Sequence, residues 1–251
     1  MSARMLYQTI VHVSGLLREL EDVGVRVEIG DDFSQYRNYR NGQTDRAGLY
    51  SMFDAASSYI DASNGFWICG FDDADNLIHS QAARLLDFGT ETLGHHLDVH
   101  RHMYITPDTT PDPSLTYYRG PAALKSISGK VCYNGDFWLA SRGLGGPRSQ
   151  GATSLLSRIQ FEIMNWVWEP DFTFALVSKQ LASKGAHLRY GYTHCEPGQW
   201  IGPDLQVTDE EYLIWMSAND ISNALSKKPA SSSIGMAVSS VRPLATVKSK
   251  D

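Results

Sequence analysis

The sequence predicts a mixed α/β protein, and two stretches carry that prediction. The run 130–141 is rich in Val, Tyr, Phe and Trp, as strands are. After it, the apolar positions have helical spacing and are expected on one face: Leu155, Leu156, Ile159, Ile163, Trp166 and Val167. Earlier in the chain, 66–71 and 77–88 are strand-like runs separated by the polar turn 72–76, which predicts a β-hairpin. With 251 residues, 42% of them hydrophobic, the chain can form one large domain or one domain with an extension.

Composition argues against several classes of protein. A net charge of −6 is unsuited to a general nucleic-acid binder, which needs a basic surface. No apolar run reaches the roughly 18 residues of a transmembrane helix, and residues 1–20 lack the continuous apolar segment of a signal peptide. The cysteines Cys69, Cys132 and Cys195 are odd in number and form no CxxC pair, so they predict neither a disulfide framework nor a zinc site. We expect a cytoplasmic protein that works without membrane or nucleic acid.

The first 60 residues begin with an amphipathic helix at 6–21 and a short, half-buried strand at 25–29. The segment 35–55 is rich in tyrosine and arginine and predicts helical turns that lead into 49–60. Tyr36 and Arg40 could hold an anionic or aromatic substrate, because a guanidinium and an aromatic ring bind such groups together. Alternatively, the tyrosines are half-buried and the arginines solvated; the sequence leaves both interpretations open.

Four histidines lie close together at positions 95, 96, 100 and 102. His96 and His100 have the i, i+4 spacing that lets two imidazoles of one helix share a metal ion. The HExxH pattern is missing, however, and few apolar residues are present to hold the segment rigid. We therefore expect a solvated histidine run and no metal site.

A glycine-rich, basic loop joins the predicted strand at 130–141 to the helix that follows it. Glycines let an anion approach the backbone, and the free N–H groups and dipole of a helix N-terminus attract it. The loop contains no GxxxxGK[ST] sequence and no GxGxxG after a first strand, so a nucleotide-hydrolysing P-loop and a dinucleotide site are disfavoured. The sequence thus predicts a site for another phosphate-bearing ligand.

The stretch 148–156, RSQGATSLL, resembles the acyl-CoA pyrophosphate loop of the GNAT superfamily (the Gcn5-related N-acyltransferases), usually written [RQ]xxGx[GA] before a helix. Arg148 and Gly151 match the first and fourth positions, whereas Thr153 departs from the last, where Gly or Ala is usual. The apolar run 172–177, a short helix at 179–185 and the step Gly191-Tyr192 then follow in the family's order. The resemblance extends over about 66–215, and the first 60 residues resemble nothing specific.

This resemblance implies a mixed, mostly antiparallel sheet flanked by helices, in which the hairpin at 66–88 precedes the CoA-binding strand. It implies that acetyl-CoA or another acyl-CoA is the co-substrate, and that an amine attacks the acyl group directly in a ternary complex. One strand would offer a backbone N–H to the thioester oxygen, and the loop would bind pyrophosphate. The residues assigned to CoA in this way are Trp138, Leu139 and Ala140 of the strand and Arg142, Arg148, Ser149, Gln150, Gly151, Ala152 and Thr153 of the loop.

Three residues are candidates for proton transfer. Asp136 stands at the head of the CoA strand among aromatic neighbours that could tune a carboxylate for use as a base, although it could also be a turn residue. Family members often carry a tyrosine near the CoA sulfur in this region, so Tyr190 and Tyr192 are candidates for the acid. Arg84, in the hairpin, could bind an acceptor carboxylate or form a structural ion pair.

Two alternatives remain beside an acyl-CoA N-acyltransferase. The donor could be an acyl carrier protein, for which Arg142, Arg148 and Arg158 would supply a basic docking patch, or the fold could sense a ligand or bind a partner without catalysis. Neither the acyl chain length nor the amine, in a small molecule or a protein, follows from the sequence, and a homodimer is possible. We divide the chain into an acceptor-side segment at 1–60, an acyltransferase core at 61–227 and a Ser-rich flexible tail at 228–251, with an edge strand at 236–238 as the tail's alternative.

Overall fold

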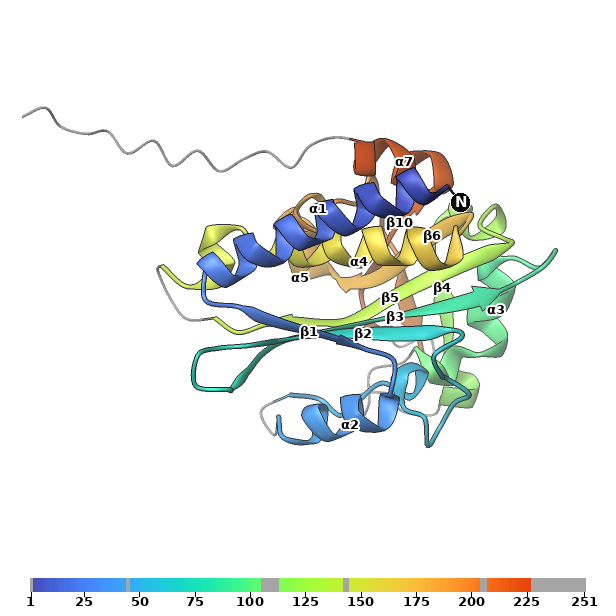
Figure 1. Cartoon of the computed structure of the whole chain (residues 1–251). Helices are drawn as coiled ribbons and strands as arrows, with labels where there is room; N and C mark the ends of the chain where they lie inside the picture. The colour runs from blue at the N-terminus through green and yellow to red at the C-terminus, as the bar shows by residue number, and fades with distance from the viewer. Residues whose placement is uncertain (1, 44–45, 105–112, 142–144, 204–206, 227–251) are drawn as a thin grey trace, which may run out of the picture.

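The computed structural model describes residues 2–43, 46–104, 113–141, 145–203 and 207–226 (Figure 1). A central sheet runs through the middle of the molecule. Its strands, in spatial order, are β1 (Arg26–Gly30), β2 (Gly65–Phe71), β3 (Leu77–Asp87), β5 (Lys130–Leu139), β6 (Phe172–Ser178), β10 (Glu211–Ser217) and β7 (His194–Glu196). A second sheet contains three short strands, β4 (Tyr117–Arg119), β8 (Gln199–Ile201) and β9 (Val207–Asp209).

The central sheet is mixed and mostly antiparallel. Each neighbouring pair in it is antiparallel apart from β5 and β6, which are parallel. A parallel pair needs a crossover between its strands, and here the crossover contains helix α4 (Ala152–Trp168). The fold class that the sequence predicted, a mostly antiparallel sheet flanked by helices, is therefore confirmed.

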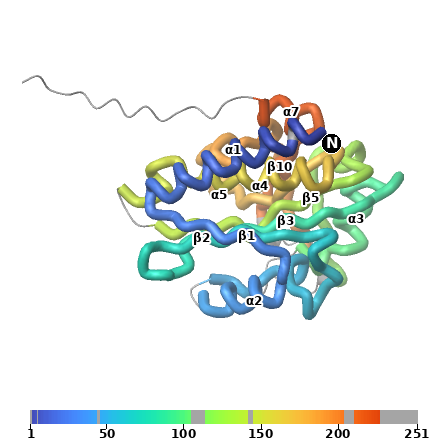
Figure 2. Tube along the Cα trace, viewed as in Figure 1, coloured from blue at the N-terminus to red at the C-terminus, as the bar shows by residue number. Residues whose placement is uncertain are grey.

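Helices cover both faces of the sheet (Figures 1 and 2). On one face, α1 (Ala3–Asp22) lies beside α4, with α7 (Ala218–Ser226) at their end. On the other face lie α2 (Phe33–Asn41) and the short helix η1 (Ser51–Phe53). The remaining helical segments are α3 (Leu93–Val99), α5 (Lys179–Ser183), α6 (Ala186–Tyr190), η2 (Arg101–Met103), η3 (Pro113–Leu115), η4 (Ala122–Lys125) and η5 (Pro147–Gln150).

Each face of the sheet has its own buried cluster. The α4 face contains Leu16 and Leu20 of α1 together with Leu156 and Ile159 of α4. The α2 face is largely aromatic, and its members include Phe33, Tyr36, Phe53, Trp67, Tyr104, Tyr133, Phe174 and Trp200. The aromatic face supplies the walls of the site described below.

Helix α4 turns a slightly different face inward from the one predicted. The predicted apolar face ended at Trp166 and Val167, but these side chains are 39% and 48% exposed. Met164 and Trp168 are buried instead, and the Trp168 ring packs on Phe66 at 5.2 Å between centroids. The apolar positions near the end of the helix fall on two faces, and packing against the sheet selects one of them.

Other predictions hold or fail locally. The strands and helices expected around the hairpin, the run 130–141 and the run 172–177 are confirmed, whereas 49–60 contains the single turn η1 and no longer helix. The second sheet was not predicted, because strands of three residues are too short to show a period. Arg142 and the tail at 228–251 lie outside the described residues. Within the described part of the chain, no helix is long and apolar enough to cross a membrane.

Candidate functional site

A gap opens in the sheet between β5 and β6. The two strands pair at three positions, from Val131 opposite Phe172 to Tyr133 opposite Phe174, and diverge beyond them. A cavity of about 330 Å³ fills this gap. Its lining comprises Arg46, Tyr50, Tyr104, Tyr133, Asn134, Gly135, Asp136, Phe137, Ser157, Gln160, Phe161, Ala175, Leu176, Val177, Ser178, Leu181, Tyr190, Tyr192 and Glu211.

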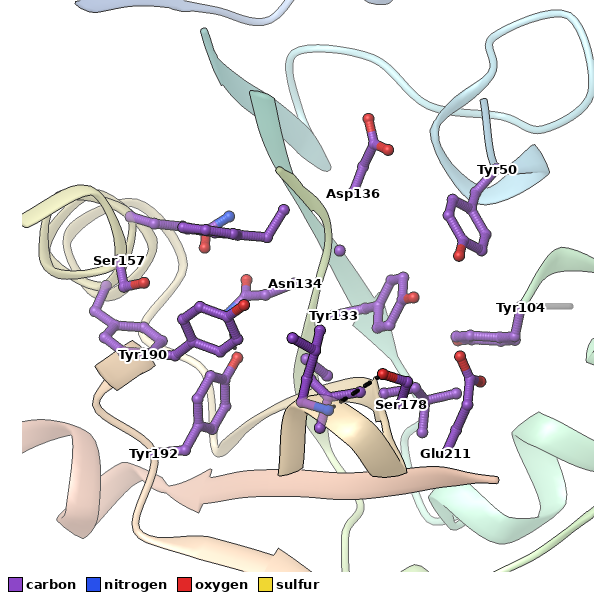
Figure 3. Close-up of a pocket in the computed structure, with 18 of the residues that line it drawn as sticks. Tyr50, Tyr104, Tyr133, Asn134, Asp136, Ser157, Ser178, Tyr190, Tyr192 and Glu211 are labelled. Atoms are coloured by element: carbon purple, nitrogen blue, oxygen red, sulfur yellow. Dashed lines mark hydrogen bonds between the residues drawn. The ribbon is translucent and has the colours of Figure 1, made fainter. Parts of the chain in front are cut away.

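The cavity passes through the sheet from one face to the other. Figure 3 shows Ser157, Tyr190 and Tyr192 on one side of β5 and Tyr50 and Glu211 on the other. The first group belongs to the α4 face and the second to the α2 face. Two molecules can therefore reach the gap, one from each face of the sheet.

A β-bulge in β5 shapes the upper wall of the gap. Ser80 pairs with Trp138 and Ala82 with Gly135, so β5 has one more residue than β3 between these positions. Asp136 lies within the bulge and has a positive φ of 53°, which Asp tolerates better than most residues do. The bulge turns its side chain toward α2, where its partners lie.

The Asp136 carboxylate is the centre of a buried charge cluster. Its Oδ2 accepts hydrogen bonds from Tyr36 Oη at 2.5 Å and Arg40 Nε at 2.6 Å, and its Oδ1 accepts one from Arg46 Nη2 at 3.1 Å. The side chains of Arg40 and Asp136 are 3% and 1% exposed. Three donors, two of them cationic, hold this carboxylate in place.

This cluster changes the interpretation of three predicted site residues. A base needs an oxygen that the substrate's proton can reach, whereas both oxygens of Asp136 already accept hydrogen bonds. Tyr36 and Arg40, proposed from the sequence as substrate-binding residues, lie behind Asp136 and outside the lining of the cavity. The geometry gives all three a structural part in holding the bulge.

Arg84 does not line the cavity either. Its guanidinium donates to the carbonyl oxygens of Met52 at 2.7 Å and Tyr59 at 2.6 Å, and to Ser58 Oγ at 2.9 Å. It therefore fastens the segment around η1 to β3, in place of the predicted contact with an acceptor carboxylate. Burial lowers the pKa of this guanidinium.

His79, on β3, contacts β5 beside the bulge. It is fully buried, and its Nδ1 lies 2.6 Å from the carbonyl oxygen of Trp138. Burial lowers the pKa of His79 to about 3, because the interior disfavours the imidazolium.

The His79 pKa predicts a loss of stability in acid. Above pH 6.5 the imidazole is neutral in both states, whereas between about 6.5 and 3 the unfolded chain binds a proton that the folded chain does not. The free energy of unfolding should then fall by about 1.4 kcal/mol per pH unit through His79. Between pH 7 and pH 5, the free energy of unfolding measured with urea should fall by about 2 kcal/mol more in the wild type than in His79→Gln. Equal losses in the two proteins would contradict this account.

The two predicted acid candidates lie together on the α4 side of the gap (Figure 3). Tyr192 is buried, and its Oη accepts a hydrogen bond from Asn134 Nδ2 at 2.8 Å. Tyr190 is half-buried and packs on Phe137 at 4.7 Å between ring centroids. Burial raises the pKa of both phenols, so each keeps its proton at neutral pH.

The α2 side of the gap contains residues that the sequence did not indicate. Tyr104 is 1% exposed, and its ring meets the Tyr133 ring edge-on at 5.0 Å. Glu211, at the start of β10, points into the same space as Tyr50 (Figure 3). The sequence does show that Glu211 stands at the start of an apolar strand. It gives no local sign that this carboxylate lies near tyrosines more than 75 residues away.

The loop before α4 has the open backbone expected of an anion site. Gly151 precedes the helix with φ +86°, and no side chain caps the helix N-terminus. A Cβ placed on Gly151 would meet nothing within 4 Å. Ser149 Oγ and Gln150 Nε2 donate to carbonyl oxygens of the loop itself, so they brace it. Ala152 and Thr153 are buried, so the exposed backbone of this turn is that of Gly151.

A second cavity, of about 360 Å³, connects this loop with the gap. Its lining comprises Leu16, Glu19, Gln150, Gly151, Ser154, Leu155, Arg158, Phe161, Leu188, Arg189, Tyr190, Gly191 and Ala224. Phe161 and Tyr190 line both cavities. The loop, the second cavity and the gap therefore follow one another along the α4 face.

The three predicted residues of the CoA strand differ in what their backbone faces. Ala140 N donates to the carbonyl oxygen of Ile78 on β3, at 2.8 Å. Neighbouring residues of a strand turn their polar backbone groups to opposite sides, so Leu139 faces the open side, where its carbonyl accepts from Arg148. Trp138 places its ring under the Arg46 guanidinium, 4.9 Å away. Of the three, Leu139 is the one whose backbone groups point away from β3, and none of the three lines the cavity.

The histidine run is partly packed. His96 lies 4.6 Å from His100 and 4.5 Å from Phe88 between ring centroids, and burial lowers the pKa of His96 to about 3. Among the described residues, no group of three or more His, Cys, Asp or Glu side chains is arranged to hold a metal ion.

The chain has a mostly antiparallel central sheet whose one parallel pair, β5 and β6, diverges around a cavity. No family model matches the sequence, and no curated protein matches it. Solved structures similar to it include FeeM, an N-acyl amino acid synthase from uncultured soil microbes (9% identity, 80% of this chain and 94% of that one, TM-score 0.44). Another is the spermidine N-acetyltransferase SpeG from Vibrio cholerae (12% identity, 78% of this chain and 96% of that one, TM-score 0.41). A third is the aminoglycoside acetyltransferase AAC(6')-Ib with coenzyme A and kanamycin (12% identity, 78% of this chain and 98% of that one, TM-score 0.37).

Proposed function

We propose that the protein is an acyltransferase that moves an acyl group from acyl-CoA to an amine. The observation that carries the proposal is the cavity that crosses the sheet between β5 and β6, with a glycine-rich loop and an uncapped helix N-terminus on one side and a polar aromatic pocket on the other. Two substrates that enter from opposite faces would meet in the gap. Holding them there converts a bimolecular reaction into a local one, which is the largest contribution such a site can make.

The donor side suits the shape and chemistry of CoA. The pyrophosphate would lie at Gly151 and the N-terminus of α4, and the pantetheine arm would pass the second cavity toward the gap. That arm contains two amides, which need hydrogen-bond partners once they leave water. Ser157 and Gln160 of α4 line the gap, and Gln160 Nε2 is buried without a partner in the described structure. Such a donor is suited to an amide oxygen.

The chemistry would take place in the gap. The amine nitrogen attacks the thioester carbon, the C–S bond breaks, and one amine proton ends on the departing sulfur. A backbone N–H on the open edge of β5, at or near Leu139, would stabilise the oxygen of the tetrahedral intermediate. Tyr190 or Tyr192, both protonated at neutral pH, would supply the proton to the thiolate.

An acyl carrier protein would present the same arm, so the gap itself fits either donor. The position of Arg158 favours CoA over an acyl carrier protein as the donor. Arg158, one of three arginines that could form a docking patch, is 14% exposed, and its guanidinium contacts Glu162 Oε1 at 3.1 Å and carbonyl oxygens of α7. It is held inside the fold and cannot bind an acidic partner.

Turnover tests the proposal directly. The purified chain is incubated with acetyl-CoA or a longer acyl-CoA and a panel of primary amines, and mass spectrometry detects the acylated product. We expect an amide product and an equal amount of free CoA. If transfer occurs from an acyl carrier protein and from no acyl-CoA, the donor assignment is wrong. If no donor yields product while CoA still binds, the fold serves as a ligand-binding module.

A further inference from the structure

The α2 side of the gap contains a buried cation without a carboxylate partner. Arg84 is 8% exposed, and within the described part of the chain its guanidinium contacts two carbonyl oxygens and one hydroxyl but no carboxylate. Its Nε is buried there without a hydrogen-bond partner. A charge that leaves water without a counter-ion costs free energy, and it creates a positive potential in the surrounding protein.

This charge lies one side chain behind the wall of the cavity. Arg84 stands directly opposite Tyr133 in the pairing of β3 with β5, so the two side chains lie on the same face of the sheet. The Tyr133 ring meets the Tyr104 ring edge-on, and both tyrosines line the cavity (Figure 3). Burial raises the pKa of the Tyr104 phenol, and the charge of Arg84 offsets part of this rise.

The hydroxyl of Tyr104 is a polar group of the cavity wall that lacks a partner. Tyr104 is 1% exposed, and its Oη has no hydrogen-bond partner in the described structure. A buried hydroxyl in this state costs free energy, so a ligand group in the cavity is its natural partner. Because the phenol keeps its proton at neutral pH, it acts as a donor. An anionic oxygen near Arg84 is the strongest acceptor for it.

The formal charges on this side of the gap also favour an anion. Three guanidinium groups lie at the cavity wall or directly behind it, those of Arg40, Arg46 and Arg84, against the two carboxylates of Asp136 and Glu211. Asp136 pairs with both Arg40 and Arg46, so that cluster alone has one positive charge in excess. A substrate that brings a carboxylate offsets the excess, whereas one that brings only an ammonium group adds to it.

We propose that the acceptor is an amino acid, whose amine enters the gap and whose carboxylate accepts a hydrogen bond from Tyr104 near the charge of Arg84. This inference rests on the proposed function and names its acceptor class. Arg84 keeps its contacts with the segment around η1 and acts on the carboxylate through its charge. The neutral amine attacks the thioester carbon, the C–S bond breaks, and one amine proton ends on the sulfur. The carboxylate is unchanged in the resulting N-acyl amino acid.

Matched acceptors test the assignment: phenylalanine against phenethylamine, and leucine against 3-methylbutylamine. Each amine is its amino acid without the carboxylate. The wild type should have a kcat/KM at least about tenfold higher for the amino acid of a pair, since the shorter amine leaves the buried hydroxyl unpaired. Tyr104→Phe keeps the ring and removes only the hydroxyl. It should lower kcat/KM about tenfold for the amino acid and less than about twofold for the amine. Differences in amine pKa cancel when the variant is compared with the wild type.

Tyr7→Phe is the matched control. Tyr7 lies on α1, is 68% exposed and lines neither cavity, so this variant should leave every kcat/KM value unchanged. Tyr104→Phe should unfold at a urea concentration no lower than the wild type, because the removed hydroxyl has no partner in the free protein. A lower midpoint would show that the hydroxyl stabilises the fold, and would overturn its assignment to a ligand.

A pair of Arg84 variants tests the part played by charge. Both Arg84→Lys and Arg84→Gln lose the contacts of the guanidinium, but only the second loses the positive charge. The preference for the amino acid should therefore remain in Arg84→Lys and fall in Arg84→Gln. An equal fall in both would remove the charge of Arg84 from the account. If neither variant folds, Tyr104→Phe still decides the acceptor class.

Three further results would overturn the inference and leave acyl transfer itself standing. Tyr104→Phe could lose equal activity with both members of a pair, the wild type could prefer the amines, or its products could include no N-acyl amino acid. Wild-type protein that binds CoA but acylates neither simple amines nor amino acids would instead refute the proposed function, and this inference with it.

Discussion

Replacing Asp136 with alanine is expected to lower the free energy of unfolding by about 3 to 5 kcal/mol. The substitution would leave the Arg40 guanidinium, whose side chain is 3% exposed, without its carboxylate, together with Arg46 and the hydroxyl of Tyr36. A buried charge that loses its partner retains the cost of leaving water, so the loss exceeds that of an ordinary hydrogen bond. Urea unfolding at pH 7 measures it.

Glu210→Ala provides the matched control. Glu210 pairs with Lys179 at 2.7 Å, but these side chains are 44% and 59% exposed, and water replaces such a partner readily. This variant should unfold almost like the wild type. If Asp136→Ala also unfolds like the wild type, the cluster does not hold the bulge, and Asp136 would again be free to serve as the base.

The second large effect concerns the donor loop. Gly151→Ala should weaken CoA binding at least tenfold, or about 1.4 kcal/mol. The added methyl group would project into the empty space in front of α4, where the pyrophosphate would approach the backbone, and a non-glycine residue also resists the φ of +86°. Isothermal titration calorimetry with CoA measures the change.

Gly24→Ala is the control that distinguishes the effect of backbone strain from the loss of a contact with the ligand. Gly24 has φ +77°, a Cβ there would likewise meet nothing within 4 Å, and the residue lines neither cavity. Both variants should lose similar stability, and only Gly151→Ala should lose affinity for CoA. Equal CoA affinities in the two proteins would place the pyrophosphate elsewhere.

The elements around the donor side could be predicted because their signals are local. The strand 130–139, the glycine-rich loop and α4 follow one another within about 40 residues, and each shows its own period or composition. The resemblance of 148–156 to a CoA loop added an expected ligand to this pattern. The open backbone at Gly151 agrees with that expectation and leaves the ligand itself to experiment.

The α2 side of the gap could not be predicted in the same way, because its residues meet only through the fold. Tyr36 and Arg40 reach Asp136 across 100 and 96 residues of sequence, so the ion pairs that hold this carboxylate have no local signature. Trp200 of the second sheet contacts Glu211 of β10, and the strands of the second sheet are too short to detect by alternation. Sequence reasoning therefore selected the carboxylate of Asp136, whose buried partners show no local signal in the sequence.

Calorimetric titration of the full chain with CoA and with adenosine 3′-phosphate 5′-diphosphate tests the central claim most directly. The second ligand carries the adenosine and its phosphates but lacks the pantetheine arm. If the gap between β5 and β6 holds the arm, CoA should bind in the micromolar range and the shorter ligand at least tenfold more weakly. Equal affinities would show that the arm stays outside the gap, and the absence of heat with CoA would remove it as the donor.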